Sequence, residues 1–112
     1  MASRAAVIAA LKLAVARRVW EIQTNAHAEL TAATPVDTGY ARANWQATLD
    51  APAAGVVAAP GDPMPEPGDG FDATRLRFVT NNASYIRRLD AGHSAQAPAG
   101  FVRLALARAV SS

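Results

Sequence analysis

This chain is divided by the stretch Thr34-Pro35-Val36-Asp37-Thr38-Gly39-Tyr40-Ala41-Arg42-Ala43-Asn44-Trp45. Pro35 lacks a backbone N–H and disfavours helical geometry in the residue before it, so the preceding element must end here. Asp37 and Thr38 offer short side-chain oxygens to the first N–H groups of a new turn, and Gly39 relaxes the backbone. We therefore predict a structural turn built from Pro35, Asp37, Thr38 and Gly39.

The residues ahead of this turn predict one long helix. Ser3 can cap its start, and neither Pro nor Gly occurs in residues 1–33. Apolar residues recur at steps of three and four, the stripe of an amphipathic helix: Ile8, Leu11, Val15, Val19, Ile22, Ala26 and Leu30. A helix from about Arg4 to about Ala33 is roughly 45 Å long at 1.5 Å per residue. Part of it must lie across a whole sheet or project onto a neighbour.

The middle of the chain predicts short strands around a loop. Residues 45–49 alternate apolar and polar side chains, which places Trp45, Ala47 and Leu49 on one face of a strand. Val56 and Val57 predict a second short strand, and residues 76–80 with Phe71 predict the next, with Leu76 and Phe78 on one face. The residues 50–73 are rich in Pro, Gly and acidic side chains, so we expect a mobile loop.

The last third predicts two helices. Asn81 and Asn82 mark a turn, Ser84 can cap a short helix containing Tyr85, Ile86 and Leu89, and Gly92 can stop it. A final helix runs from Phe101 to about Val110, with Phe101, Leu104 and Ala105 on one face and Arg103 and Arg108 facing solvent or a partner. The whole chain, 1–112, is then one α+β domain. Its parts are a long N-terminal helix (1–33) packed on a small antiparallel sheet (45–80), a turn motif (34–45) and a C-terminal helical segment (81–112).

The charges are few but unevenly distributed. The net charge of +2 is too small to indicate nucleic-acid binding by itself. Five acidic residues and no basic one lie between Asp50 and Asp72, whereas six arginines lie between Arg75 and Arg108 against Asp90 alone. A molecule with one acidic and one basic region can stack head to tail with its own copies. A solvated loop beside an ordinary basic face explains the same pattern, and both interpretations stay open.

The sequence contains no pattern typical of an active site, a cofactor site or a metal centre. The absence of cysteine excludes a thiolate zinc site and a cysteine nucleophile. His27 and His93 each stand alone, whereas zinc needs three or four converging ligands, so we expect His27 to be a surface or interface residue. The acidic series lacks the spacing of a calcium loop: Asp62, Glu66, Asp69 and Asp72. Lys12, Arg17 and Arg18 interrupt the apolar N-terminal run, so we expect neither a signal peptide nor a membrane span.

Two phrases of the sequence resemble a family of small tailed-phage proteins, known as tail-component, neck or tail-completion proteins. The first is Thr34-Pro35-Val36-Asp37-Thr38-Gly39, followed by Arg42 and Trp45. The second is Thr80-Asn81-Asn82-Ala83-Ser84-Tyr85-Ile86-Arg87-Arg88-Leu89-Asp90-Ala91-Gly92-His93-Ser94-Ala95-Gln96-Ala97-Pro98-Ala99-Gly100-Phe101-Val102-Arg103. They occur in the family's order and spacing, and with the first helix they span nearly the whole chain. The short Pro-rich middle departs from the family's pattern.

The resemblance implies a structural protein of the siphophage virion, assembled in the bacterial host cytoplasm and located in the neck between head and tail. Copies would form a ring, a hexamer or dodecamer, between the connector or stopper proteins and the tail terminator or tail tube. DNA would pass through the channel without sequence-specific binding, and neither an enzyme activity, a cofactor nor a membrane partner is implied. A tail terminator or head-closure ring fits the same resemblance, and a small DNA-binding protein is the alternative from another class.

A ring needs two unlike edges on each copy, and the acidic loop and the Arg-rich last third supply candidates. We expect inter-subunit contacts from six charged residues: Asp62, Glu66, Asp69, Arg87, Arg88 and Arg103. The alternative is that these arginines decorate a soluble surface.

The predicted turn can be tested by removing its capping oxygen. Asp37→Ala should lower the free energy of unfolding by about 1 kcal/mol, because the N–H group that the carboxylate accepts from loses its partner. Urea denaturation of both proteins measures the difference. Equal stability of the variant would contradict the turn.

Overall fold

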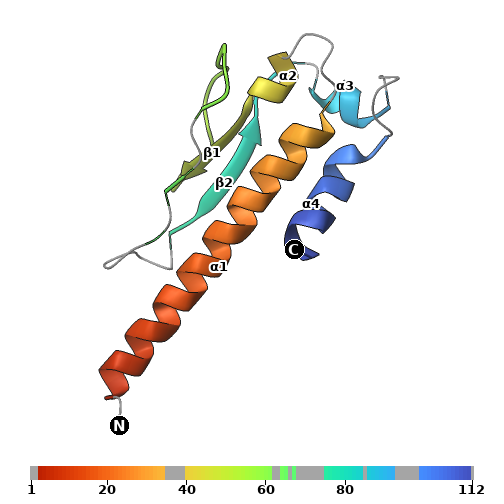
Figure 1. Ribbon diagram of the computed structural model, residues 1–112. Helices are drawn as coiled ribbons and strands as arrows, with labels where there is room; N and C mark the ends of the chain where they lie inside the picture. The colour runs from red at the N-terminus through yellow and green to blue at the C-terminus, as the bar shows by residue number, and fades with distance from the viewer. Residues whose placement is uncertain are drawn as a thin grey trace.

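The computed structural model describes residues 3–34, 40–61, 64, 65, 67, 75–84, 86–92 and 99–111. Within these ranges the elements follow the order α1 (Arg4–Ala33), α2 (Tyr40–Ala43), β1 (Trp45–Leu49), β2 (Arg77–Asn81), α3 (Ile86–Asp90) and α4 (Phe101–Ser111). The sheet lies along one side of α1, and α4 lies along another (Figure 1). The predicted α+β architecture is therefore confirmed. The turn residues Pro35, Asp37, Thr38 and Gly39 lie outside the described residues.

Helix α1 begins and ends where the sequence predicts. The Ser3 hydroxyl accepts a hydrogen bond from the backbone N–H of Ala6 at 3.1 Å, which caps the first turn. At the other end Thr34 has extended geometry, as expected for a residue that precedes proline. Its N–H still donates to the carbonyl of Leu30 at 3.1 Å, so the helix closes with a normal last turn.

Three residues of the first phrase hold the end of α1: Thr34 and Trp45 connect it to β1, and Arg42, on α2, binds its last carbonyls. The Thr34 hydroxyl donates to the Leu30 carbonyl at 2.6 Å and accepts from Trp45 Nε1 at 2.7 Å. The Arg42 guanidinium donates to the carbonyls of Ala32 and Thr34 at 3.2 and 3.3 Å. These carbonyls are among the last of the helix, where backbone oxygens lack partners and a cation is favoured. The phrase is therefore a structural clamp.

The sheet is small and antiparallel. β1 and β2 pair in the register Trp45↔Asn81 through Leu49↔Arg77. Five residues at about 3.3 Å each give a sheet roughly 17 Å long. The face that carries Trp45, Ala47 and Val79 packs on α1. The structure places β2 one residue later than predicted, so Leu76 precedes the strand and is exposed.

The strand predicted at Val56 and Val57 is wrong. Residues 51–61, all of them described, contain no strand. The side-chain amide of Asn44 instead takes the place of a neighbouring strand: its Oδ1 accepts from the Val57 N–H at 2.8 Å, and its Nδ2 donates to the Val57 carbonyl at 3.1 Å. One side-chain amide can pair with the backbone N–H and carbonyl of a single residue, so it cannot form the ladder of a strand. Pro52 and Pro60 lack the N–H groups that would extend the pairing.

The core is built largely from alanine. The buried cluster contains Ala26, Leu30, Trp45, Ala105 and Ala109, with Val79, Ile86 and Val102 packed against it. Small side chains let α4 approach α1 closely. The prediction that Leu104 shares the buried face of α4 is wrong, because that face repeats every four residues through Phe101, Ala105 and Ala109. Leu104 lies off this line and is 49% exposed.

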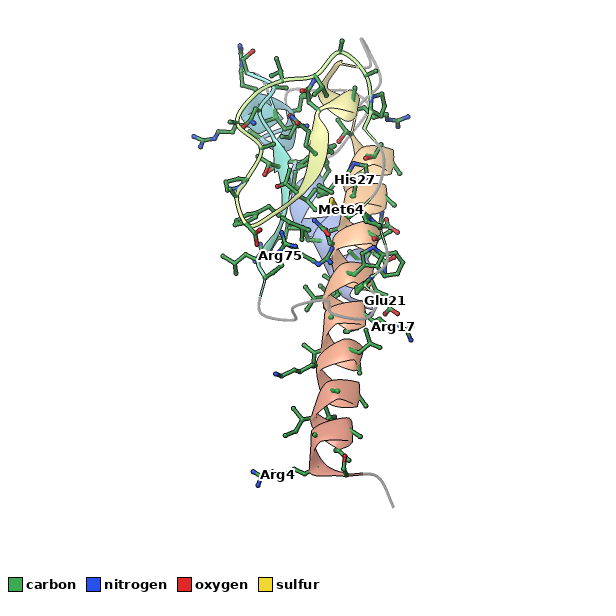
Figure 2. The ribbon with its side chains drawn as sticks, turned by 90° about the vertical axis from the view of Figure 1, so that its left-hand side faces the viewer. Arg4, Arg17, Glu21, His27, Met64 and Arg75 are labelled. Carbon is green, nitrogen blue, oxygen red and sulfur yellow. The ribbon has the colours of Figure 1, made fainter. Side chains whose placement is uncertain are left out.

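The first half of α1 projects beyond the rest of the chain (Figures 1 and 2). The Arg18 guanidinium donates to the Val110 carbonyl at 3.0 Å, which marks where α4 ends along α1. Ile8, Leu11 and Val15 precede this point and are exposed. The radius of gyration, 16.5 Å, exceeds the roughly 13 Å expected of a compact chain of this length. Of the two arrangements that the sequence allows, the helix therefore adopts the projecting one.

Helices α3 and α4 follow the prediction closely, with α3 at Ile86–Asp90 and α4 at Phe101–Ser111. Gly92 stops α3 with a φ of +97°, a left-handed conformation that favours glycine. A Cβ atom at this position would lie 3.2 Å from the Cβ of Ala99. The connection between the two helices therefore needs glycine here for both reasons.

Thr34→Val tests the clamp at the end of α1. Valine keeps the shape but removes the hydroxyl that the buried Trp45 Nε1 donates to, so we expect the free energy of unfolding to fall by about 1–3 kcal/mol. Thr31→Val is the matched control, because the partly buried Thr31 hydroxyl also donates to a carbonyl four residues earlier, that of His27, at 2.6 Å. Urea denaturation measures both. Equal losses would contradict the role of the Trp45 contact.

Candidate functional site

The structure places three of the six predicted interface residues. Arg87 and Arg88 lie on α3 and Arg103 lies on α4, and all three are exposed. The acidic residues Asp62, Glu66 and Asp69 lie outside the described residues.

Asp90 brings the arginine-bearing helices together. Its backbone carbonyl accepts from the N–H of Gly100 at 2.7 Å, and its carboxylate accepts from the N–H of Val102 at 3.1 Å. The carboxylate thus serves a first-turn N–H of α4, where negative charge is also favoured by the helix dipole. As a result, the end of α3 and the start of α4 present their arginines at one end of the molecule.

The asparagines of the second phrase hold backbone segments in place. The Asn81 side chain donates to the Ala41 carbonyl at 2.7 Å and accepts from the Ala83 N–H at 2.9 Å. The Asn82 side chain donates to the carbonyls of Ala53 and Gly55 at 2.7 and 3.0 Å. The Asn-Asn pair therefore fixes α2 and the segment after β1 against the end of β2.

Gln23 forms the main polar contact between α1 and the sheet. Its Nε2 donates to the carbonyls of Thr48 and Phe78, each at 3.0 Å, so one side chain contacts both strands. Its Oε1 accepts from Arg77 at 2.7 Å. Gln23 is buried, and buried amides left without partners are costly. This contact therefore sets the position of the helix along the sheet.

Arg77 carries its charge into a partly buried position on β2. Loss of water around the guanidinium lowers the pKa of Arg77, and the nearby positive charge of Arg75 lowers it further. Arginine stays protonated despite such a shift. The guanidinium acts here as a hydrogen-bond donor to Gln23 and does not transfer protons.

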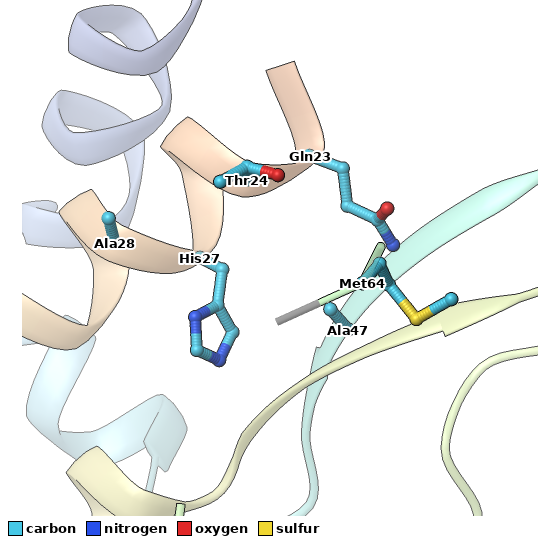
Figure 3. A pocket seen from close by; sticks show the side chains of 6 residues that line it. All are labelled: Gln23, Thr24, His27, Ala28, Ala47 and Met64. Carbon is cyan, nitrogen blue, oxygen red and sulfur yellow. The ribbon is translucent and has the colours of Figure 1, made fainter. Parts of the chain in front are cut away.

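A hollow between α1 and β1 is a candidate ligand site (Figure 3). It has a volume of about 190 Å³ and is lined by Gln23, Thr24, His27, Ala28, Ala47 and Met64. Ligand pockets usually measure about 300–1,000 Å³, so this hollow is small. Trp20 Nε1 donates to the Met64 carbonyl at 2.8 Å and holds that residue beside α1.

His27 is the titratable residue of this hollow. Its Nε2 lies 2.7 Å from the Trp45 carbonyl, which can only accept, so Nε2 carries a proton and donates it. The ring of His27 is partly buried and bonded within the chain. Thr24 contributes a hydroxyl to the same lining, but none of the six lining residues carries a carboxylate. We interpret this arrangement as another link between α1 and β1.

Apolar side chains are exposed on two elements that bound a second hollow. On α1 these are Val7, Ile8, Leu11 and Val15, and on α4 they are Leu104, Leu106 and Val110. Between α1, α4 and β2 lies a hollow of about 300 Å³ whose apolar lining includes Val19, Ile22, Val79, Val102 and Leu106. Such surfaces mark interaction sites when they are contiguous. They are the features of this chain best suited to binding another molecule.

Among the described residues, no group of three or more His, Cys, Asp or Glu side chains could hold a metal ion. None of the helices in the same ranges has the length and apolarity needed to cross a bilayer. Comparison with protein-family models, with curated proteins and with solved structures gave no match.

The burial of two side-chain amides was not expected from the sequence. Gln23 and Asn44 are both buried, and each binds backbone groups of another segment. A signal for Gln23 existed, because a polar residue beside Ile22 and Ala26 interrupts the apolar face of α1. Asn44 gave no such signal, since Asn next to a turn is ordinary in sequence.

Gln23→Leu tests the contact between α1 and the sheet. The substitution leaves two strand carbonyls and the Arg77 guanidinium without the amide, so we expect a loss of about 2–4 kcal/mol in the free energy of unfolding. Gln46→Leu is the matched control: it removes an exposed amide that donates to the Gly55 carbonyl, and should cost well under half as much.

The double variant Gln23→Leu/Arg77→Leu separates the two contributions. If the guanidinium suffers from the loss of Gln23, the double variant is more stable than the sum of the single losses predicts. Strict additivity, measured by urea denaturation of all four proteins, would contradict the coupling.

Proposed function

We propose that this chain is a structural protein of the tailed-phage head–tail junction, a neck or tail-completion protein that forms a ring joining the head connector to the tail. The observation that carries the proposal is the pair of phrases at residues 34–45 and 80–103, which resemble that family in order and spacing. The protein would act by adhesion and alignment around the DNA channel, without catalysis.

The roles of the phrase residues support this proposal. Thr34 and Trp45 join the end of α1 to β1, Arg42 joins α2 to the end of α1, and Asn81 and Asn82 hold neighbouring backbone segments. These five residues of the two phrases thus help to maintain the shape of the body.

The distribution of charge also supports a ring. Arg87, Arg88 and Arg103 are exposed where α3 meets α4, while residues 50–72 of the sequence carry five acidic residues. Asp50 is already neutralised by Arg75, so the acidic edge would depend on the others. Unlike edges on one copy make heterologous contacts, which close into rings when the rotation permits.

Light scattering tests the ring in solution. We expect a hexamer or dodecamer that dissociates as salt is raised, because contacts between exposed charges are screened within about 8 Å at physiological ionic strength and about 3 Å at 1 M salt. Arg88→Glu should weaken the ring, whereas Lys12→Glu, the same change of charge on the projecting part of α1, should not. A ring that is indifferent to both salt and Arg88→Glu would contradict the charged edges.

Removal of the protein from its phage tests the position in the virion. A neck or tail-completion role predicts filled heads and tails of normal length that fail to join. Tails of abnormal length would instead indicate a tail terminator, and heads that lose their DNA would indicate a head-closure ring. Electron microscopy of the lysate distinguishes these outcomes, and joined, infectious particles without the protein would overturn the proposal.

The DNA-binding alternative has its own measurement. Exposed arginines on α3 and α4 could contact phosphates, and such binding weakens steeply and linearly on a logarithmic salt scale. Tight binding of the free protein to duplex DNA at physiological salt, with normal joining of heads and tails in its absence, would favour that function.

A further inference from the structure

The apolar stripe on α1 has a symmetric spacing in the part that α4 and the sheet leave fully or partly uncovered. Its apolar members lie at Ile8, Leu11, Val15, Val19 and Ile22. Relative to Val15, these positions are four and seven residues before and four and seven residues after. The spacing therefore reads the same in both directions along the helix.

We propose that a second copy of this chain pairs with the first through this stripe, with the two α1 helices antiparallel and a two-fold axis passing at Val15. In such a pair, Ile8 of each copy faces Ile22 of the other and Leu11 faces Val19. Val15 faces its own counterpart. Contacts of this reciprocal kind define a two-fold interface, in which one surface patch is complementary to itself.

The geometry of the two halves of the stripe favours a second copy as the occupant. Ile8, Leu11 and Val15 protrude from the free half of α1, with Leu11 62% and Val15 53% exposed. Val19 and Ile22 are partly buried and line the hollow of about 300 Å³ between α1, α4 and β2. The protruding side chains of one half thus match the recess of the other half.

The protruding half cannot fill the recess of its own chain. Both lie on one continuous helix of 30 residues, so residues 8 and 11 can never approach residues 19 and 22 of the same chain. The arm of another copy, running in the opposite direction, can do so. It would also cover Leu106, an exposed residue of α4 that lines the hollow.

The charges on this surface set the salt response of the pair. Lys12 and Arg18 flank the stripe on opposite sides of α1, and no acidic residue lies between them in the sequence, so charge adds no attraction to the pairing. Arg18 forms an ion pair with Glu21 of its own helix at 3.3 Å. The pairing is therefore apolar in origin, and added salt should leave it unchanged or strengthen it.

The size of the contact predicts a reversible dimer. Residues 8–22 span roughly 22 Å of helix with a width of about 10 Å. This footprint is well below the roughly 800 Å² per partner of standard stable interfaces. We therefore expect monomers and dimers in equilibrium across micromolar concentrations.

Sedimentation equilibrium at several micromolar concentrations, in low and high salt, tests the pairing. Leu11→Glu should raise the dissociation constant of the dimer at least about tenfold, because it places two carboxylates in the apolar contact. Ala9→Glu is the matched control, with the same charge on the same exposed turn but on the opposite side of the helix. Circular dichroism checks that both variants fold.

A second variant tests the position of the axis. The chain has no cysteine, so Val15→Cys introduces a single thiol that meets its own counterpart across the axis. Mild oxidation should convert this variant to a covalent dimer much faster than Ala9→Cys. A wild type that is monomeric at every concentration, a Leu11→Glu variant with unchanged association, or equal cross-linking of the two cysteine variants would each overturn the proposal.

This inference goes beyond the head–tail role and does not depend on it. The ring proposed above would weaken with salt and with Arg88→Glu, whereas the α1 pair would resist salt and respond to Leu11→Glu. The salt response and the two variants therefore show which of the two proposals has failed.

Discussion

The indole of Trp45 is the contact on which the body of this molecule depends. Its ring is 7% exposed and fills the core between α1, α4 and the sheet. Its Nε1 donates to the Thr34 hydroxyl, and its backbone carbonyl accepts from His27. One residue at the start of β1 thus supplies the largest side chain of the core and two hydrogen bonds to α1. Aromatic residues with a polar atom are suited to this double role.

Trp45 carries so much because the rest of the core is small. Ala26, Ala105 and Ala109 bury little apolar area and fix no orientation by shape. Buried amides supply the orientation instead: Gln23 sets α1 against both strands, and Asn44 attaches the segment after β1. A fully satisfied amide accepts only one arrangement of donors and acceptors, which gives this body a specificity that its alanines lack.

Much of the fold could be predicted from sequence because its signals are local. Ser3, Pro35 and Gly92 mark helix ends through caps, a missing N–H and a positive φ, and these effects act within a few residues. The failures are not local. Val56 and Val57 resemble a strand, but their neighbour is a side chain of Asn44, and Leu104 misses the core because α4 meets α1 along a narrow line of alanines. The arginine-rich surface could be predicted from the charges, and the apolar stripe on α1 from its periodicity. The exposure of the first half of α1 could not, because it depends on how far α4 and the sheet extend along the helix.

The two proposed surfaces use different physics and occupy different ends of the molecule. Helix α3 and the start of α4, which carry Arg87, Arg88 and Arg103, lie near the C-terminal end of α1, and the apolar stripe extends towards its N-terminal end (Figure 1). A body with a thin alanine core buries little apolar area, and contacts between chains would bury more. Pairing through the stripe on α1 would bury such apolar area. The arginines at the other end would orient a partner by charge while burying little apolar area. Association through the stripe would stabilise the long helix, and the arginine end would stay free to select the next partner.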